Sequence, residues 1–258
     1  MTLRLGDVAR SGGFDLIHRA AVGSTNADAM ALMGRDRVWV VADEQTAGRG
    51  RRGREWTSPR GNLYASLRLI APAEPRVLSQ LCFVAALALA DGTDRVAPKS
   101  AASLTLKWPN DVLIDGAKVA GILIEGVHGP AEVAVVIGCG VNVVSHPENT
   151  PYPATALALR DPSVDAAALF IGLSDAFAER LAQWQRGGGF SDLRAAWLAR
   201  AAGLGSPIVV RLPAGDLAGR FEALDEDGQL ILSDGASRRA ISAGEVFFPA
   251  LSRTTGAA

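Results

Sequence analysis

The 258-residue sequence has few of the residues that disulfide-rich, metal-binding or membrane proteins depend on. Its two cysteines, Cys82 and Cys139, lie in apolar stretches, which favours buried reduced thiols. Its three histidines show no spacing typical of metal ligands. No run reaches the roughly 18 apolar residues of a membrane span, and the N-terminus lacks the apolar core of a signal peptide. We therefore expect a cytoplasmic protein with no membrane contact and no metal held by its own side chains.

The sequence also lacks an excess of charge of either sign. Its 26 basic and 27 acidic residues give a formal net charge of −1, whereas general nucleic-acid-binding domains are usually basic. Positive charge is concentrated in Gly48–Arg54 (GRGRRGR), where four arginines are interleaved with three glycines. Glycine lets the backbone approach a ligand closely, and guanidinium groups match phosphate and carboxylate oxygens in pairs. The stretch is typical of a loop that wraps a small anion, although a basic surface loop or a nucleic-acid patch has the same composition.

The first two thirds of the chain mix strand and helix patterns. β-branched and apolar stretches predict strands at 38–42, 62–70, 104–108, 112–114, 118–125 and 133–137. Apolar or amphipathic stretches predict helices at 27–33, 78–90, 165–184 and 190–200. Ser24 or Thr25 is expected to cap the first helix, and Asp115-Gly116 to form a tight turn between two strands.

After Gly205-Ser206-Pro207 the pattern changes to short strands at 208–212, 217–224, 229–232 and 238–241, separated by turn residues. Such spacing predicts a small β-barrel. We therefore expect an α+β fold, with a mixed sheet and packed helices in a first domain of residues 1–205 and a small SH3-like barrel in residues 206–258.

Five motifs resemble those of the biotin protein ligases in their order and spacing: GSTN at 23–26, GRGRRGR at 48–54, KWPND at 107–111, KVAGILIE at 118–125 and GCGVN at 138–142. The resemblance covers about residues 15–248, and GRGRRGR together with KWPND makes it specific. No helix-turn-helix fits before Ser24, so the chain is similar to the monofunctional group, which lacks an N-terminal DNA-binding domain.

The resemblance implies a two-step reaction that uses biotin, ATP and Mg²⁺. The carboxylate of biotin attacks the α-phosphate of ATP, giving biotinyl-5′-AMP and pyrophosphate. A lysine of a biotin carboxyl carrier protein, such as that of acetyl-CoA carboxylase, then attacks the anhydride. Because both first-step reactants are anions, positive charge and positioning should carry that step. Mg²⁺ is expected to be held largely by phosphates and waters, and both a monomer and a homodimer remain open.

The resemblance also assigns site residues by their positions in the motifs. The catalytic residues that it implies are Arg49, Lys118 and Asp111. The residues implied to contact biotin are Ser24, Thr25, Asn26, Gln45, Gly48, Arg49, Lys118 and Gly121. The residues implied to lie on the ATP or adenylate side are Arg51, Arg52, Arg54, Trp56, Lys107, Asn110 and Asn142.

Plainer interpretations exist for several of these residues. Ser24 and Thr25 can be simple helix caps, Trp56 can be a core side chain, and Lys118 can be a turn lysine in solvent. Asn110 and Asp111 can scaffold the site, or Asp111 can assist the acceptor lysine. The arginine loop, residues 46–54, has almost no apolar anchor, so we expect it to be mobile until a ligand supplies counter-charge.

Three other functions are weighed against the ligase. A lipoate or octanoate ligase or transferase of related fold would carry similar chemistry, but those relatives lack an arginine loop of this kind. A biotin-sensing regulator is disfavoured because no DNA-reading module fits before Ser24. A nucleic-acid-binding protein using Arg49–Arg54 is disfavoured by the net charge of −1.

Overall fold

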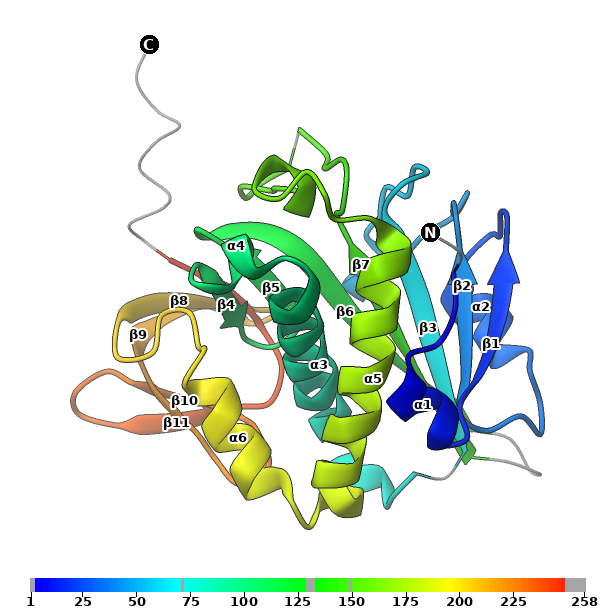
Figure 1. The fold of residues 1–258 in the computed structure, drawn as a ribbon. Helices are drawn as coiled ribbons and strands as arrows, with labels where there is room; N and C mark the ends of the chain where they lie inside the picture. Colours follow the sequence, from blue (N-terminus) through cyan, green and yellow to red (C-terminus); the bar gives the residue numbers. More distant parts are fainter. Residues whose placement is uncertain (1–2, 71, 129–132, 149, 249–258) are drawn as a thin grey trace.

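The computed structural model describes residues 3–70, 72–128, 133–148 and 150–248, which form two β-sheets with helices packed around them (Figure 1). The larger sheet has the order β1-β2-β3-β7-β6-β5-β4, and only β1 and β2 pair in parallel. Its strands are β1 (Asp15–Arg19), β2 (Val38–Ala42), β3 (Leu63–Ile70), β4 (Leu104–Lys107), β5 (Asp111–Ile114), β6 (Ala117–His128) and β7 (Val133–Val141).

The smaller sheet follows in the chain and is antiparallel throughout, with the order β11-β10-β9-β8-β12. Its strands are β8 (Pro207–Leu212), β9 (Gly215–Leu224), β10 (Leu230–Ser233), β11 (Arg238–Ile241) and β12 (Glu245–Phe247). The α-helices are α1 (Asp7–Ser11), α2 (Thr25–Met30), α3 (Leu81–Val96), α4 (Pro98–Ala101), α5 (Ala166–Trp184) and α6 (Phe190–Leu198). Short 3₁₀ turns are η1 (Arg51–Gly53), η2 (Pro75–Gln80), η3 (Leu157–Leu159) and η4 (Gln185–Gly187).

The main core lies between the larger sheet and the helix pair α3 and α5, which run side by side over one face of it (Figure 1). Gly92 and Gly172 mark the closest approach of the two helices, because a Cβ on Gly92 would lie 2.8 Å from the backbone nitrogen of Leu173. On the opposite face, α2 packs Ala29 against Val40 and Val136 in a small second cluster. That arrangement leaves the N-terminal end of α2 beside β3 and β7, where the site is built.

The stretch Pro75–Val96 corrects one expectation about membranes. Its most apolar 18 residues have a mean hydropathy of 1.3, so by length and composition it matches a membrane span. The sequence shows no uninterrupted apolar run here because polar side chains are interspersed among the apolar ones, although the mean hydropathy is high. However, 72% of that window is buried inside the protein, which is the environment of a core helix.

The expected α+β fold with a mixed sheet is confirmed, and each predicted strand and helix has a counterpart. Asp115 and Gly116 adopt positive φ of 48° and 76° in the turn between β5 and β6, as the dipeptide predicts. The capping prediction is confirmed for the position of Ser24, which is the N-cap of α2, but its side chain makes no capping hydrogen bond, and Thr25 lies inside the helix. The sequence pattern missed β1, α1, α4 and β12, which are short. The division into domains at residues 205 and 206 stays a prediction, and residues 249–258 of the second domain lie outside the described residues.

Candidate functional site

A polar pocket opens over the face of the larger sheet that α3 and α5 do not cover. Its floor consists of three glycines on β6 and β7: Gly121, Gly138 and Gly140. Gly121 and Gly140 face each other in the strand register, and a Cβ on Gly140 would lie 2.6 Å from the ring of Trp56. A Cβ on Gly138 would overlap Oδ1 of Asn26. The glycines therefore admit the protein's own side chains close to the sheet.

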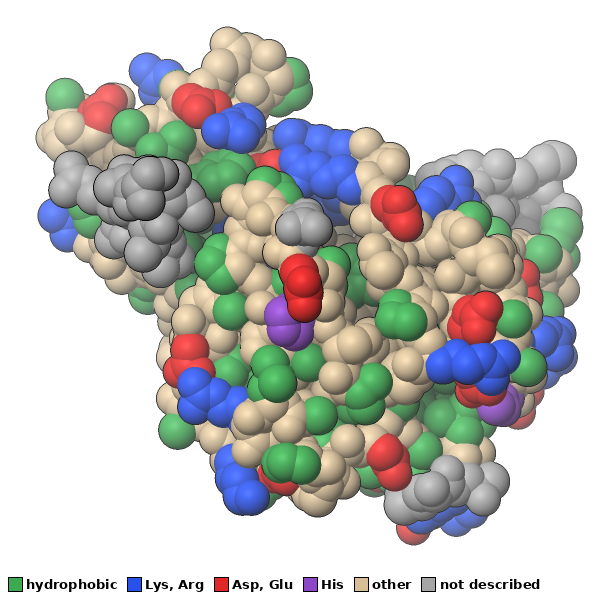
Figure 2. Space-filling model, turned by 90° about the horizontal axis from the view of Figure 1, so that it is seen from above, with side chains coloured by type: hydrophobic (Ala, Val, Ile, Leu, Met, Phe, Trp, Pro, Cys, Tyr) green, Lys and Arg blue, Asp and Glu red, His purple; other side chains and the backbone are tan. Residues whose placement is uncertain are grey.

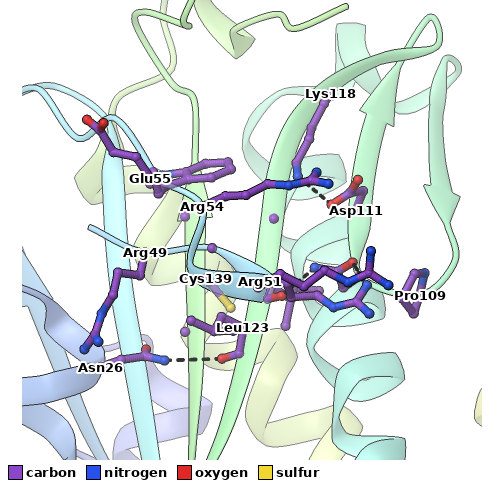
Figure 3. A pocket seen from close by; sticks show the side chains of 18 of the residues that line it. Asn26, Arg49, Arg51, Arg54, Glu55, Pro109, Asp111, Lys118, Leu123 and Cys139 are labelled. Carbon is purple, nitrogen blue, oxygen red and sulfur yellow. Dashed lines mark hydrogen bonds and ion pairs between the residues drawn. The ribbon is translucent and has the colours of Figure 1, made fainter. Parts of the chain in front are cut away.

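Asn26 is anchored at the deep end of the pocket by three hydrogen bonds. Its Oδ1 accepts from the hydroxyl of Ser66 at 2.6 Å, and its Nδ2 donates to Glu125 at 2.7 Å. The same Nδ2 donates to the carbonyl of Leu123 at 3.4 Å (Figure 3). The side chain is buried, with 5% of its surface exposed. Ser66 and Glu125 were missed by sequence reasoning because they lie on β3 and β6, 40 and 99 residues along the chain from Asn26.

The network continues from Ser66 to the loop that carries the arginines. The hydroxyls of Ser66 and Thr25 lie 2.7 Å apart, and Gln45 Oε1 accepts from the Thr25 backbone N–H at 2.8 Å. Gln45 Nε2 donates to Ser58 at 2.9 Å, and Ser58 donates to the carbonyl of Trp56 at 2.7 Å. The deep end of the pocket thus presents a connected set of donors and acceptors whose positions are fixed by one another.

Lys118 lies in the middle of the pocket and is not a solvent-exposed turn residue. Its Nζ is 2.6 Å from Asp111 Oδ1, and its side chain is 13% exposed. The ammonium also lies 5.3 Å from the ring centroids of Trp56 and Tyr152. The interpretation of Lys118 as a hairpin lysine in water is therefore wrong. Trp56 is likewise not a core side chain, since it is only half-buried and lies on the glycine floor.

Asp111 is shared between two lysines, because Lys107 Nζ lies 3.9 Å from its other carboxylate oxygen. The Lys107 ammonium is surrounded by the rings of Tyr152, Phe247 and Phe248, at 5.8, 5.7 and 5.9 Å from their centroids. Burial lowers the pKa of Lys107, and the neighbouring Asp111 carboxylate partly offsets this. The positive charge on Lys107 is therefore less stable than it would be in water, and a bound anion would stabilise it.

The four arginines of the loop have different surroundings. Arg51 donates to Asn110 Oδ1 at 3.0 Å and to the Gly244 carbonyl at 3.4 Å, while Arg54 pairs with both oxygens of Glu245 at 2.7 and 2.6 Å. The hydrogen bonds from Arg54 hold the pKa of Glu245 below its ordinary value. The expectation that only a ligand could supply counter-charge is thus wrong for Arg54.

Arg49 points the other way, toward Asn26 (Figure 3), and makes no hydrogen bond or ion pair with any side chain in the described part of the chain. In the view from above, the largest group of Lys and Arg side chains lies in the upper middle of the picture (Figure 2). Arg49 therefore leaves a guanidinium available for an anion between the polar deep end and the lysines.

Most of the predicted site residues line this one pocket: Ser24, Thr25, Asn26, Gln45, Arg49, Arg51, Arg52, Arg54, Trp56, Lys107, Asn110, Asp111, Lys118 and Gly121. Two do not. Gly48 lies behind it, where a Cβ would be 2.5 Å from the carbonyl oxygen of Trp56. Asn142 is buried and donates to the Thr155 carbonyl at 3.1 Å, so its contact with adenine stays a prediction.

The pocket has a cavity volume of about 100 Å³, because Trp56 and the arginine loop occupy much of it. Sites for small ligands usually have roughly 300–1,000 Å³. A ligand as large as a nucleotide conjugate therefore requires these side chains to move. The Cys139 thiol below the floor is buried, and burial raises its pKa to about 12, so it offers no nucleophile. Within the described ranges, no group of three His, Cys, Asp or Glu side chains could hold a metal ion.

Comparison with known proteins identifies the family. Residues 34–142 match the biotin/lipoate A/B protein ligase family, and residues 203–248 match the C-terminal domain of biotin protein ligases. The chain is 45% identical to the biotin–[acetyl-CoA-carboxylase] ligase of Paracoccus denitrificans, over 89% of this chain and 98% of that one. It is 35% identical to the enzyme of the same name from Mycobacterium tuberculosis, over 92% and 90% of the two chains.

The fold agrees with these sequence matches. The biotin protein ligase of Aquifex aeolicus, solved in complex with biotin and ATP, superimposes with a TM-score of 0.79 at 27% identity and covers 90% of this chain and 97% of its own. Three findings agree: the two domain matches come in the expected order, two relatives are more than 30% identical over most of the chain, and the fold is the same. The chain therefore belongs to the biotin protein ligase family.

Proposed function

We propose that this protein is a biotin–[biotin carboxyl carrier protein] ligase, which activates biotin with ATP and transfers it to a lysine of a carrier protein. The observation that supports this most directly is the order of chemistry along the pocket. A fixed set of donors and acceptors around Asn26 lies at the deep end, and cations of Arg49, Lys118 and Arg54 lie toward the opening. This order fits a ligand with a polar ring at one end and a carboxylate at the other.

In the first step, the ureido ring of biotin would contact the Ser24–Asn26 segment and its valeryl chain would lie along the glycine floor. Arg49 and Lys118 would hold the carboxylate and the α-phosphate together, which lowers the repulsion between two anions. Lys118 is already positioned for this by Asp111 at 2.6 Å. The attacking group needs no base, because a carboxylate is ionised at pH 7.

The phosphates would be contacted by Arg51, Arg52, Arg54 and Lys107, and the adenine would be contacted by Trp56. Mg²⁺ would accompany ATP. Three carboxylates of the described residues line the pocket, and two of them, Asp111 and Glu245, are paired with cations, so the donor set favours a metal held by phosphates and waters. The ion would add positive charge to the leaving pyrophosphate.

In the second step, a carrier lysine would attack the carbonyl of the anhydride, forming an amide with biotin and releasing AMP. That lysine must first lose a proton, since its pKa in water is about 10.4. Asp111, which lies between Lys107 and Lys118, would assist this loss of the proton. The carrier is expected to belong to acetyl-CoA carboxylase or a related carboxylase. With both thiols free, Cys139 buried and Cys82 half-buried, and with ATP as co-substrate, we place the reaction in the cytoplasm.

The test is incubation with ATP, Mg²⁺, biotin and a carrier domain, followed by mass spectrometry of the carrier. We expect one biotinyl group on one lysine, and release of pyrophosphate from biotin and ATP without carrier. Lipoate and octanoate are the competing substrates, because the matching family includes lipoate ligases. Their apolar heads offer no donor or acceptor to the polar groups of the Ser24–Asn26 segment, so they should not compete with biotin. Modification of the carrier by lipoate in preference to biotin would refute the proposal.

A further inference from the structure

The smaller sheet contributes a charged side chain to the pocket wall. Glu245, the first residue of β12, lines the pocket together with Gly244 and Val246. Its two carboxylate oxygens accept from Nη1 and Nη2 of Arg54 at 2.7 and 2.6 Å, across 191 residues of chain. This bidentate geometry fixes the plane of the guanidinium group as well as its position.

Glu245 is the fixed partner of this pair. Its side chain is 17% exposed, whereas that of Arg54 is 50% exposed. β12 pairs with β8, and Glu245 lies opposite Arg211, whose guanidinium stacks on Phe247 at 4.4 Å. Arg54, by contrast, follows the glycine-rich turn η1. The sheet therefore sets where the arginine lies.

Arg54 retains donors for a ligand while it is held. A guanidinium group has five N–H donors, and Glu245 uses two of them. Lys107 and Lys118 line the same pocket, so Arg54 can act on an anion there together with other cations. An unpaired arginine on a loop would have to be ordered by the incoming anion, which reduces affinity.

We infer that Glu245 is a positioning residue for the nucleotide, which holds the Arg54 guanidinium so that its remaining donors meet the phosphate chain of ATP. This inference rests on the proposed function. It gives the smaller sheet a role in nucleotide binding through the orientation of an arginine on the other part of the chain. The hydrogen bonds from Arg54 keep the pKa of Glu245 low, so the carboxylate is ionised at neutral pH and a glutamine removes its charge while keeping its shape.

The test is Glu245→Gln, with the rate of pyrophosphate release measured against ATP concentration at saturating biotin and without carrier. We expect the KM for ATP to rise about tenfold, the effect of losing one charged hydrogen-bonded partner, while the KM for biotin stays unchanged. Glu245→Asp, which keeps the charge, should recover part of the ATP affinity. Glu222→Gln is the matched control, because Glu222 accepts from Arg238 at 3.0 Å on the same sheet and does not line the pocket.

The double variant Arg54→Glu/Glu245→Arg distinguishes two roles of Glu245: positioning the Arg54 guanidinium for ATP, and simply attaching the arginine loop to the smaller sheet. It restores an ion pair between loop and sheet but removes the guanidinium from the loop, so the KM for ATP should remain high. Recovery of a normal KM in this double variant would overturn the inference. An unchanged or lower KM in a folded Glu245→Gln protein would also overturn it, and a lower value would show that Glu245 competes with phosphate.

Calorimetric titration with ATP keeps the two hypotheses apart. A wild-type protein that binds ATP but forms no biotinyl-AMP would refute the proposed function. The effect of Glu245→Gln on the ATP dissociation constant would still test the positioning role. A loss of ATP affinity in that variant supports it, and equal affinity of both proteins refutes it.

Discussion

Gly138→Ala should disrupt the deep end of the pocket from within the sheet. The added Cβ would overlap Oδ1 of Asn26, and Gly138 lies inside β7 with no positive φ, so the backbone itself accepts alanine. Asn26 is buried and cannot move without breaking its bonds to Ser66 at 2.6 Å and Glu125 at 2.7 Å. The substitution therefore acts through the hydrogen bonds of one side chain.

The magnitude follows from those bonds. Each net hydrogen bond contributes about 0.5–1.5 kcal/mol, and a buried polar group left without a partner costs about 1–3 kcal/mol. We expect the free energy of unfolding to fall by about 2–4 kcal/mol, which for a protein of this size lowers Tm by roughly 5–15 °C. Biotin affinity should fall as well, because the donors and acceptors around Asn26 no longer hold their positions.

Thermal unfolding and calorimetric titration with biotin are the measurements, with Gly188→Ala as the control. A Cβ on Gly188 would meet its nearest neighbour at an ordinary 3.5 Å, far from the pocket. A double-mutant cycle isolates the cause: in an Asn26→Ala background the clash is absent, so Gly138→Ala should then cost almost no stability. The reasoning is refuted if the single variant keeps its Tm and its biotin affinity, or if the cost persists without Asn26.

Three further predictions concern the opening of the pocket. Arg49→Ala should lower the rate of adenylate formation by a factor of about 10²–10³, because a positioned cation is lost. Tm should stay unchanged, because the Arg49 guanidinium has no hydrogen bond or ion pair among the described side chains. Pyrophosphate release at the normal rate would contradict this. Gly140→Ala would place a Cβ 2.6 Å from the Trp56 ring. Because Trp56 is on a loop and can shift, Tm should change by only a few degrees, while ATP-dependent quenching of tryptophan fluorescence should be reduced. A large loss of Tm with normal quenching would count against this. Lys107→Met should raise Tm while lowering activity, because burial lowers the pKa of Lys107 and its charge therefore opposes folding below that pKa. The gain in Tm should shrink as the pH rises toward the ordinary pKa of lysine. A destabilised variant would show that the contact of Lys107 with Asp111 outweighs the cost of burial.

The sequence determined most of the elements and most of the residues that line the pocket. Local patterns were sufficient for β2, β3, α3 and α5, because runs of buried apolar residues repeat at the strand or helix period whatever surrounds them. The Asp115-Gly116 turn followed from the backbone freedom of its residues. The motifs contain most residues of the pocket, because charged and glycine-rich stretches can be recognised in the sequence without coordinates.

The tertiary structure alone decided which groups face each other. Ser66 and Glu125 read as ordinary strand residues, and only the pairing of β3, β7 and β6 brings them to Asn26. Ser24 looked like a capping residue, yet its side chain makes no capping bond and lines the pocket. Glu245 gave no signal, because its partner Arg54 is 191 residues away and meets it only where the second sheet packs against the first. Ion pairs and hydrogen bonds act over a few ångströms in space, so the order of residues along the chain cannot specify them until the sheets have assembled.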